Sequence, residues 1–346
     1  MKKSYILICF VIFIATKSFS QIGGSYVYDF LNLPSNARTA ALGGTVLTVK
    51  DRDLSMAFQN PAVLNKEMNN QLSLSYIPYL SDIKYGYAAY AHTYDKIGTF
   101  SGGIQFVNYG KFDAADETGA ITGSFNAADY SFNIAYAHQM DSLFSIGATL
   151  KTIYSHYEDY NSFGMAVDVA ANYFNAEKQV CMTIIARNVG YQVTSYTPDN
   201  HEPLPIELQF GISKKLSKAP FRFGLNVTHL EKFDITFDNP NDATETDPLT
   251  GLPVEEKTTT ANKILRHFIP SLELVISKNF MIQAAYNFQR RNELAYTTRK
   301  STSGFSFGFG FGIKRFTFNY GRAIYNLAGG SSHFTVNVAL GNADKK

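Results

Sequence analysis

The sequence predicts an all-β fold, a transmembrane antiparallel β-barrel of about 14 strands. The most informative stretch is Gly304–Arg322, where aromatic residues occupy every second position and Gly, Ser, Thr and Asn fill the gaps. Lys314-Arg315 interrupts the alternation as a two-residue turn, so the aromatic residues of both strands face one side of a hairpin. An aromatic outer band over a small, polar inner face is typical of a barrel in a lipid bilayer.

Two features of the whole chain agree with this fold class. No apolar run reaches the ~18 residues expected of a spanning helix. Charged residues make up only 17% of the chain and aromatic residues 14%, all of them Phe or Tyr. The formal net charge of +2 gives no argument for nucleic acid as a partner. A chain without a spanning helix can cross a bilayer only as a closed barrel.

Residues 1–20 are predicted to form a cleaved signal peptide. Two lysines precede the apolar run Tyr5–Ala15, which is too short to span a bilayer as a helix. Ser18 and Ser20 supply the small residues of a cleavage site. We therefore expect the mature chain to begin at Gln21.

Residues 21–70 do not alternate like strands and are predicted to form an N-terminal plug segment inside the lumen. Small residues surround Arg38, and Leu54–Asn69 is compatible with a short helix. Because this segment precedes the first strand, it starts on the periplasmic side, and we expect it to occupy the periplasmic half of the barrel. Residues 71–346 are then predicted to be the outer-membrane β-barrel itself.

Period-two alternation and turn signals give the strands of the barrel in order. An even strand number is required of a single-chain barrel with both termini on the periplasmic side. The expected spans are 71–79, 83–94, 97–109, 128–140, 143–156, 163–174, 180–189, 204–216, 220–230, 264–276, 280–291, 303–313, 316–325 and 333–340.

The connections between these strands alternate in length. Those after even-numbered strands are short turns such as Asp141-Ser142, whereas those after odd-numbered strands are mostly long and include 110–127, 190–203 and 231–263. This asymmetry is typical of periplasmic turns and extracellular loops. The loop at 231–263 is acidic and rich in Thr, and it lacks the regular spacing of a calcium loop. We therefore expect a solvated external loop there, with protein docking or calcium binding as the alternative.

Parity assigns each side chain to the lipid or the lumen. Phe309 and Phe318 are expected to face lipid, and Asn319 is expected to face the lumen. The alternative of a large soluble β-sandwich is disfavoured, because so many strands with so few charges would leave a poorly solvated surface.

The sequence offers no catalytic or metal-binding constellation with suitable spacing, so we expect no enzymatic activity, cofactor or metal. The Gly308-x-Gly310-x-Gly312 pattern is not followed by a helix, which a phosphate-binding loop requires. Cys9 lies inside the apolar run of the leader and is not read as a lipid anchor. Cys181 is expected to be a buried or lipid-facing thiol rather than a nucleophile.

Motifs near the N-terminus resemble those of the PorQ family, outer-membrane proteins of the type IX secretion system of Bacteroidetes. The run YDFLNLPSNAR at residues 28–38 carries the most specific part of the resemblance. The following ARTAALGG and NPAVL elements also resemble PorV and, more distantly, the FadL long-chain fatty acid transporters. The likeness extends to the closing segment NYGRAIYNLAGG, so it covers most of the mature chain. The residues singled out as structural motif are Arg38, Gly43, Gly44, Asn60 and Pro61.

The resemblance implies a FadL-like barrel without catalytic groups that belongs to the attachment complex of the type IX secretion system. Its implied partners are PorZ-like and PorU-like surface proteins, a PorV-like barrel, outer-membrane lipid and lipopolysaccharide. The implied role is to anchor the partners that process secreted cargo and attach it to the cell surface. The alternative is a FadL-like transporter of hydrophobic small molecules, and a general porin is disfavoured by the expected plug. The chain departs from the barrel pattern in its ending, GNADKK, which lacks a terminal aromatic residue.

Overall fold

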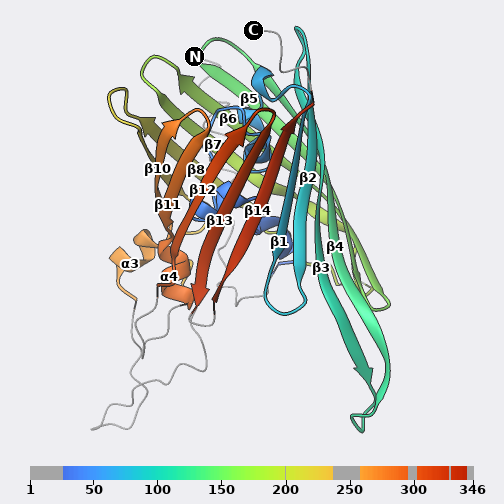
Figure 1. Ribbon diagram of the computed structural model, residues 1–346. Helices are drawn as coiled ribbons and strands as arrows, with labels where there is room; N and C mark the ends of the chain where they lie inside the picture. The colour runs from blue at the N-terminus through green and yellow to red at the C-terminus, as the bar shows by residue number, and fades with distance from the viewer. Residues whose placement is uncertain (1–25, 199, 237–257, 295–301, 327–328, 341–346) are drawn as a thin grey trace, which may run out of the picture.

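In the computed structural model, the strands form one closed antiparallel barrel (Figure 1). Each strand pairs with its neighbours in sequence, and β1 (Gln71–Pro78) pairs with β14 (Gly329–Ala339) to close the wall. The described part of the chain contains fourteen strands, so the predicted fold class is confirmed. The structure describes residues 26–198, 200–236, 258–294, 302–326 and 329–340.

The remaining elements follow the chain order of the prediction. The other strands are β2 (Lys84–Tyr94), β3 (Gly98–Ala115), β4 (Ile121–Gln139), β5 (Phe144–Tyr157), β6 (Tyr160–Asn175), β7 (Val180–Thr194), β8 (Glu207–Lys215), β9 (Phe221–Val227), β10 (Phe268–Ser277), β11 (Phe280–Tyr286), β12 (Phe305–Ile313) and β13 (Phe316–Asn326). The helical turns are η1 (Asp29–Asn32), α2 (Ala37–Ala41), η2 (Leu54–Phe58), η3 (Pro61–Val63), η4 (Lys66–Met68), α3 (Thr260–Leu265) and α4 (Phe288–Leu294). Among the described residues, none of the helices is both long and apolar enough to cross a membrane.

The two ends of the barrel differ as predicted. The short turns that follow the even-numbered strands gather at the upper end in Figure 1, and helices α3 and α4 lie at the lower end. The last strand returns to the upper end, where the Leu340 amide donates to the Asn70 carbonyl at 2.7 Å. By the usual asymmetry of outer-membrane barrels, the upper end is periplasmic and the lower end is extracellular.

The expected bounds of two long loops are wrong. Strand β3 continues to Ala115 and β4 begins at Ile121, so most of the expected 110–127 loop is a two-stranded ribbon. Strand β7 likewise runs to Thr194, into the expected 190–203 loop. Both errors have one cause: backbone pairing with a neighbouring strand continues where the side chains no longer alternate between a lipid face and a lumen face.

Two stretches predicted as strand are partly helical instead. Helix α3 includes the start of the span expected at 264–276, and α4 takes the end of the span expected at 280–291. The predicted signal peptide at 1–20 and most of the acidic 231–263 loop lie outside the described residues. Those predictions, including the cleavage before Gln21, therefore stay predictions.

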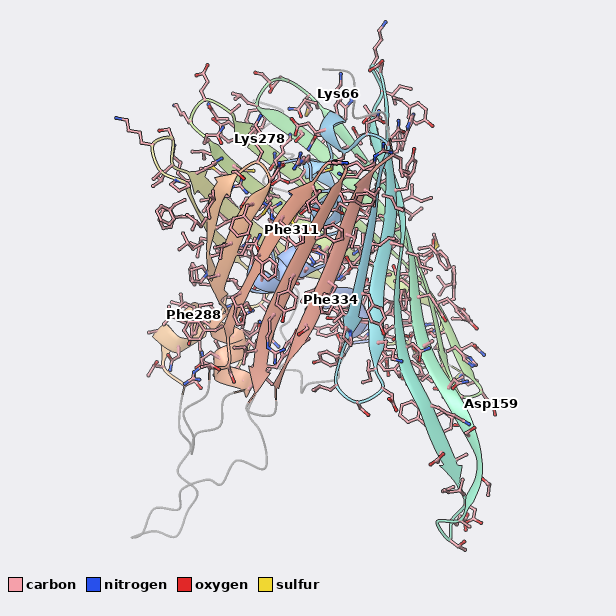
Figure 2. All side chains as sticks on the ribbon, in the orientation of Figure 1. Lys66, Asp159, Lys278, Phe288, Phe311 and Phe334 are labelled. Atoms are coloured by element: carbon pink, nitrogen blue, oxygen red, sulfur yellow. The ribbon has the colours of Figure 1, made fainter. Side chains whose placement is uncertain are left out.

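The assignment of side chains to lipid and lumen is confirmed for the aromatic hairpin. Phe309 is 42% exposed on the outer face, whereas Asn319 is 4% exposed and faces inward. Figure 2 shows Phe311 and Phe334 on the outer surface of the wall. The outer face carries apolar side chains from most strands, as a barrel embedded in hydrocarbon requires.

Replacing Phe309 with arginine is expected to cost about 2–4 kcal/mol, because Phe309 lies midway along β12 and hence near the bilayer midplane. The control is Phe316→Arg, which lies beside the β12–β13 turn and should cost about 0–1 kcal/mol. A denaturant titration of refolding into lipid vesicles measures both. Equal costs at the two depths would contradict the placement of this hairpin in the membrane.

Candidate functional site: the N-terminal segment in the lumen

Residues 26–70 contact the inner face of the barrel from one end to the other. Near the extracellular end, the Val27 amide donates to the Pro203 carbonyl at 3.0 Å. The segment leaves at the periplasmic end, where Asn70 meets the last strand. The segment therefore reaches beyond the periplasmic half, which corrects the placement expected from the sequence. Its action as a plug stays a prediction.

Helix α2 packs on the bare inner face of the β12–β13 hairpin. A Cβ atom built on Gly321 would lie 2.0 Å from the Ala37 carbonyl oxygen, and one on Gly308 would lie 2.6 Å from the Ala41 Cβ. The Ala37 amide also donates to Thr335 Oγ1 at 2.9 Å. The glycines that the sequence marks as a small lumen face are thus the docking surface of a helix.

The two motif glycines end helix α2 and fix the following turn. Gly43 and Gly44 have φ angles of +97° and +101°, a region that favours glycine. The Gly43 carbonyl accepts from Asn287 Nδ2 at 3.0 Å and from Arg290 Nη2 at 3.2 Å. A Cβ on Gly43 would lie 2.4 Å from the Ile269 side chain. The pair therefore joins α2 to the wall near the extracellular end of β10 and β11.

The Asn-Pro motif anchors the segment to the opposite wall. Asn60 caps η3 by accepting from the Ala62 amide at 2.9 Å, and Pro61 begins the turn. The Asn60 amide group donates to the Leu47 carbonyl and to Thr183 Oγ1 on β7. The turn packs so closely on β5 that a Cβ on Gly147 would lie 2.5 Å from the Pro61 carbonyl carbon.

Arg38, the remaining motif residue, is the centre of a buried ion-pair network. Its guanidinium lies 2.8 Å from Asp51 and 3.2 Å from Asp53, both in the same segment, and 2.8 Å from Glu273 on β10. Arg222 on β9 pairs with the second oxygen of Glu273. Only 1% of the Arg38 side chain is exposed.

The pKa shifts in the segment follow from this geometry. Burial by itself lowers the pKa of Arg38, but Asp51, Glu273 and Asp53 outweigh it and raise the pKa well above its usual value. Burial raises the pKa of Asp51, but Arg38 and Arg222 outweigh it and lower the pKa to about 2. Arg38 and Asp51 are therefore both charged at neutral pH, and Arg38 ties the segment to Glu273 in the wall.

A second buried charge cluster lies on strands β5 to β7. Lys151 Nζ is 2.7 Å from Asp168, and neither side chain is exposed. Lys151 also donates to Asn188 Oδ1 at 2.7 Å and lies 5.4 Å from the centre of the Phe58 ring of η2. Arg187 donates to Gln59 Oε1 at 3.3 Å. None of these residues was singled out from the sequence, because isolated charges within strands carry no spacing signal.

The extracellular half of the lumen holds an apolar cluster instead. Phe30 and Leu31 of η1 pack there against inward-facing side chains of the wall. Just beyond, Asp129 accepts from the Tyr109 hydroxyl at 2.6 Å and the Tyr157 hydroxyl at 2.8 Å. The buried members of the cluster are Val27, Tyr28, Phe30, Leu31, Ile77, Tyr85, Val107, Ile153, Ala166 and Leu204.

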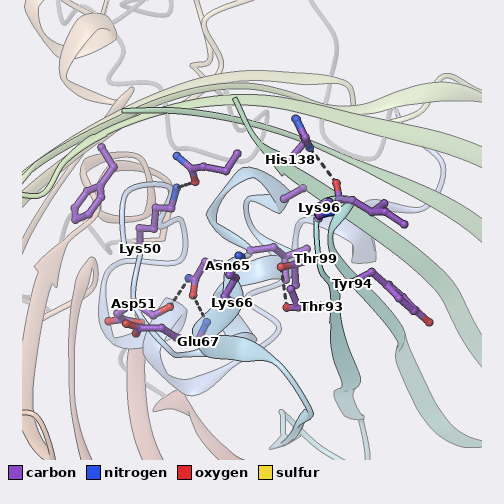
Figure 3. A pocket seen from close by; sticks show the side chains of 16 residues that line it. Lys50, Asp51, Asn65, Lys66, Glu67, Thr93, Tyr94, Lys96, Thr99 and His138 are labelled. Atoms are coloured by element: carbon purple, nitrogen blue, oxygen red, sulfur yellow. Dashed lines mark hydrogen bonds between the residues drawn. The ribbon is translucent and has the colours of Figure 1, made fainter. Parts of the chain in front are cut away.

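A cavity of about 540 Å³ opens at the periplasmic end (Figure 3). Its charged lining includes Lys50, Lys66 and Glu67, and Lys50 Nζ donates to Gln139 Oε1 at 3.0 Å. A second depression, of about 410 Å³, is lined by aromatic rings of the β12–β13 hairpin, with Phe309 and Phe311 among them. The larger cavity is thus periplasmic, with charged side chains in a mainly apolar lining, and the smaller one lies against the lipid-facing rings.

The described residues show no grouping of three or more His, Cys, Asp or Glu side chains that could hold a metal ion. Cys181 is buried, 3% exposed, and donates to Asn172 Oδ1 at 3.0 Å. The thiol therefore belongs to the packing between β6 and β7.

A closed barrel with an aromatic outer face and a structured N-terminal segment in its lumen defines an outer-membrane β-barrel protein. Solved structures of this class are similar to the chain along nearly its whole length. A mutant of the TodX monoaromatic hydrocarbon channel matches with a TM-score of 0.51 and 12% identity, covering 90% of this chain and 98% of that one. The Pseudomonas putida toluene transporter TodX matches with a TM-score of 0.50 and 11% identity, covering 93% and 98%.

At this level of identity the likeness shows the fold alone, a barrel similar to that of TodX. No family model matches the chain, and no curated protein matches it.

Proposed function

We propose that this protein is a non-enzymatic outer-membrane anchor in the attachment complex of a type IX secretion system. It would hold PorZ-like and PorU-like surface proteins beside a PorV-like barrel while they process cargo and attach it to lipopolysaccharide. The proposal rests on the PorQ-like motifs at residues 28–64. The motif residues in that stretch, Arg38 to Pro61, are those that fasten the segment to the wall.

The observation that carries the proposal is the Arg38 network. Moving the segment aside to open a path would separate Arg38 from three carboxylates inside the lumen. Removing one partner of a buried ion pair costs about 3–5 kcal/mol. A segment held in this way suits a plug in a rigid support better than a gate that opens at each transport cycle.

The second candidate is a transporter of hydrophobic small molecules. The structural comparisons favour it more directly than they favour the anchor, because both reported structures are of TodX, named a monoaromatic hydrocarbon channel and a toluene transporter. The large cavity is compatible with this function, since more of its lining is apolar than polar, although Lys50, Lys66 and Glu67 also line it. A transporter of apolar compounds is expected to offer a mainly apolar binding site.

Deleting the gene separates the two functions. For an anchor, we expect the cargo protease to stay active, while the surface partners leave the outer membrane and cargo loses its lipopolysaccharide attachment. Fractionation and immunoblotting of cargo and partners measure this, and the wild-type gene supplied in trans is the control. If cargo remains attached and the deletion strain instead fails to take up a hydrophobic compound, the transporter hypothesis replaces the anchor.

A further inference from the structure

The hairpin of β3 and β4 extends beyond the barrel wall as a free two-stranded ribbon. The pairing of β2 with β3 ends at Asn108, and the pairing of β4 with β5 ends at Ala127. Beyond those points β3 and β4 pair only with each other, from Lys111 opposite Asn126 to Ala115 opposite Ile121. At about 3.4 Å per residue the ribbon extends on the order of 20 Å past the wall. Figure 2 shows it reaching past Asp159 of the β5–β6 turn at the extracellular end.

One face of the ribbon is apolar and exposed. Phe112 and Phe125 lie opposite each other with stacked rings, 5.3 Å between centroids and 18° between planes. Phe112 is 42% exposed and Ile121 is 69% exposed. An isolated two-stranded ribbon is marginally stable in water, and packing against another surface is what normally stabilises it. The ribbon is thus an element whose apolar face lacks a covering layer within the described chain.

The tip of the ribbon is acidic and preorganised. Asp116 Oδ1 accepts from the Thr118 amide at 2.9 Å, the Thr118 hydroxyl at 2.6 Å and the Ala120 amide at 3.0 Å. These hydrogen bonds, that of the Thr118 hydroxyl foremost, lower the pKa of Asp116. Residues 109–126 carry three carboxylates against one lysine.

The charge indicates what could cover the apolar face. An anionic lipopolysaccharide surface would repel an acidic tip, so the ribbon is not suited to lie on the membrane. A protein with an apolar patch bordered by lysine and arginine would complement both the phenylalanine pair and the carboxylates.

We propose that the ribbon of residues 109–126 is the docking surface for a basic protein at the cell surface. The partner covers Phe112 and Phe125 with an apolar patch, and its lysine or arginine side chains pair with the carboxylates of Asp116 and Glu117 at the tip. This inference deepens the proposed anchoring function and rests on it for the setting, the outer surface of the cell.

The test isolates the complex from outer membranes through an affinity tag and quantifies every co-purified protein relative to the barrel. Carbodiimide, which joins carboxylates directly to lysines, identifies the protein that meets the ribbon. We expect cross-links from Asp116 or Glu117 to lysines of one partner. We also expect Phe112→Ser/Phe125→Ser to lower its retention at least about tenfold. The matched control is Leu80→Ser, an exposed apolar side chain, 48% accessible, in the neighbouring β1–β2 connection.

Charge reversal and truncation complete the test. Glu117→Lys should lower retention and weaken its fall between about 50 mM and about 500 mM salt, because exposed ion pairs are screened. Replacing residues 111–126 with a short turn leaves the pairing of β3 with β2 and of β4 with β5 intact. Full retention of the partner by this truncated barrel would overturn the inference. So would cross-links to a second copy of the chain alone.

The outcomes separate this inference from the proposed function. Cargo that detaches in the deletion strain but stays attached when the ribbon is truncated would support the anchoring function. The same result would contradict the ribbon as the docking surface. Cargo that stays attached in the deletion strain would contradict the anchoring function. A ribbon-dependent cross-link to a basic surface protein in the same experiments would still support the ribbon as a docking surface.

Discussion

Replacing Arg38 with methionine is expected to destabilise the folded barrel by about 3–5 kcal/mol, because the carboxylates of Asp51, Asp53 and Glu273 would be left without their shared cation. Methionine nearly matches the length of the arginine stem, so the loss is mainly electrostatic. Arg222 still pairs with Glu273, which limits the cost on the β10 side. Denaturant titration of the protein in detergent or lipid measures the change in unfolding free energy.

The control for Arg38 is Arg52→Met in the same segment. The Arg52 guanidinium is at the surface and donates to the Lys278 carbonyl at 3.0 Å, so its removal should cost about 0.5 kcal/mol or less. Planar bilayers give a second readout. We expect the wild-type protein to be closed to ions and the Arg38→Met protein to conduct intermittently as the segment loosens. Equal stability of the two variants would contradict the role of the Arg38 network.

Replacing Lys151 with methionine is expected to lower the free energy of unfolding by about 3–5 kcal/mol, as for Arg38. Asp168 would then keep one hydrogen bond, from the backbone N–H of Asn188 at 2.8 Å. Its carboxylate would stay buried without a cation. The side chains of Lys151 and Asp168 are both fully buried, so water cannot replace the lost partner. The same titration measures the effect.

The double variant Lys151→Met/Asp168→Asn tests whether this cost comes from the uncompensated charge. Asparagine has the shape of aspartate and can still accept from the Asn188 amide, so the double variant should recover about 1–3 kcal/mol relative to Lys151→Met alone. If the two costs simply add, the loss comes from packing around Phe58 and the electrostatic explanation is wrong.

Strand number, lipid-facing parity and the asymmetry of the two ends could be predicted from the sequence. The reason is that side chains facing hydrocarbon must be apolar, and these are every second residue of a strand. The alternating phenylalanines from Phe305 to Phe311 show this pattern in the sequence. The five motif residues were found through resemblance rather than chemistry. Their spacing alone does not say that Arg38 would meet Glu273, more than two hundred residues later in the chain.

The remaining differences arise where no bilayer constrains the side chains. Most of the ribbon lies in the stretch 110–127 that was expected to be a long loop, since its residues lie outside hydrocarbon and need not alternate strictly. Helices α3 and α4 were missed for the same reason. The inner face of β12 and β13 was assigned correctly to the lumen, but the glycines there serve a close approach of α2 rather than an open pore.

The sequence by itself determined that the chain is a barrel with a distinct N-terminal segment, because period-two alternation and its absence are local properties. Only the tertiary structure decided what that segment touches. Closure of the barrel places Arg38 beside Glu273 and Arg222, and it places Gly321 beneath Ala37. Buried ion pairs and contacts without room for a Cβ depend on distances between residues remote in sequence, which no local pattern encodes.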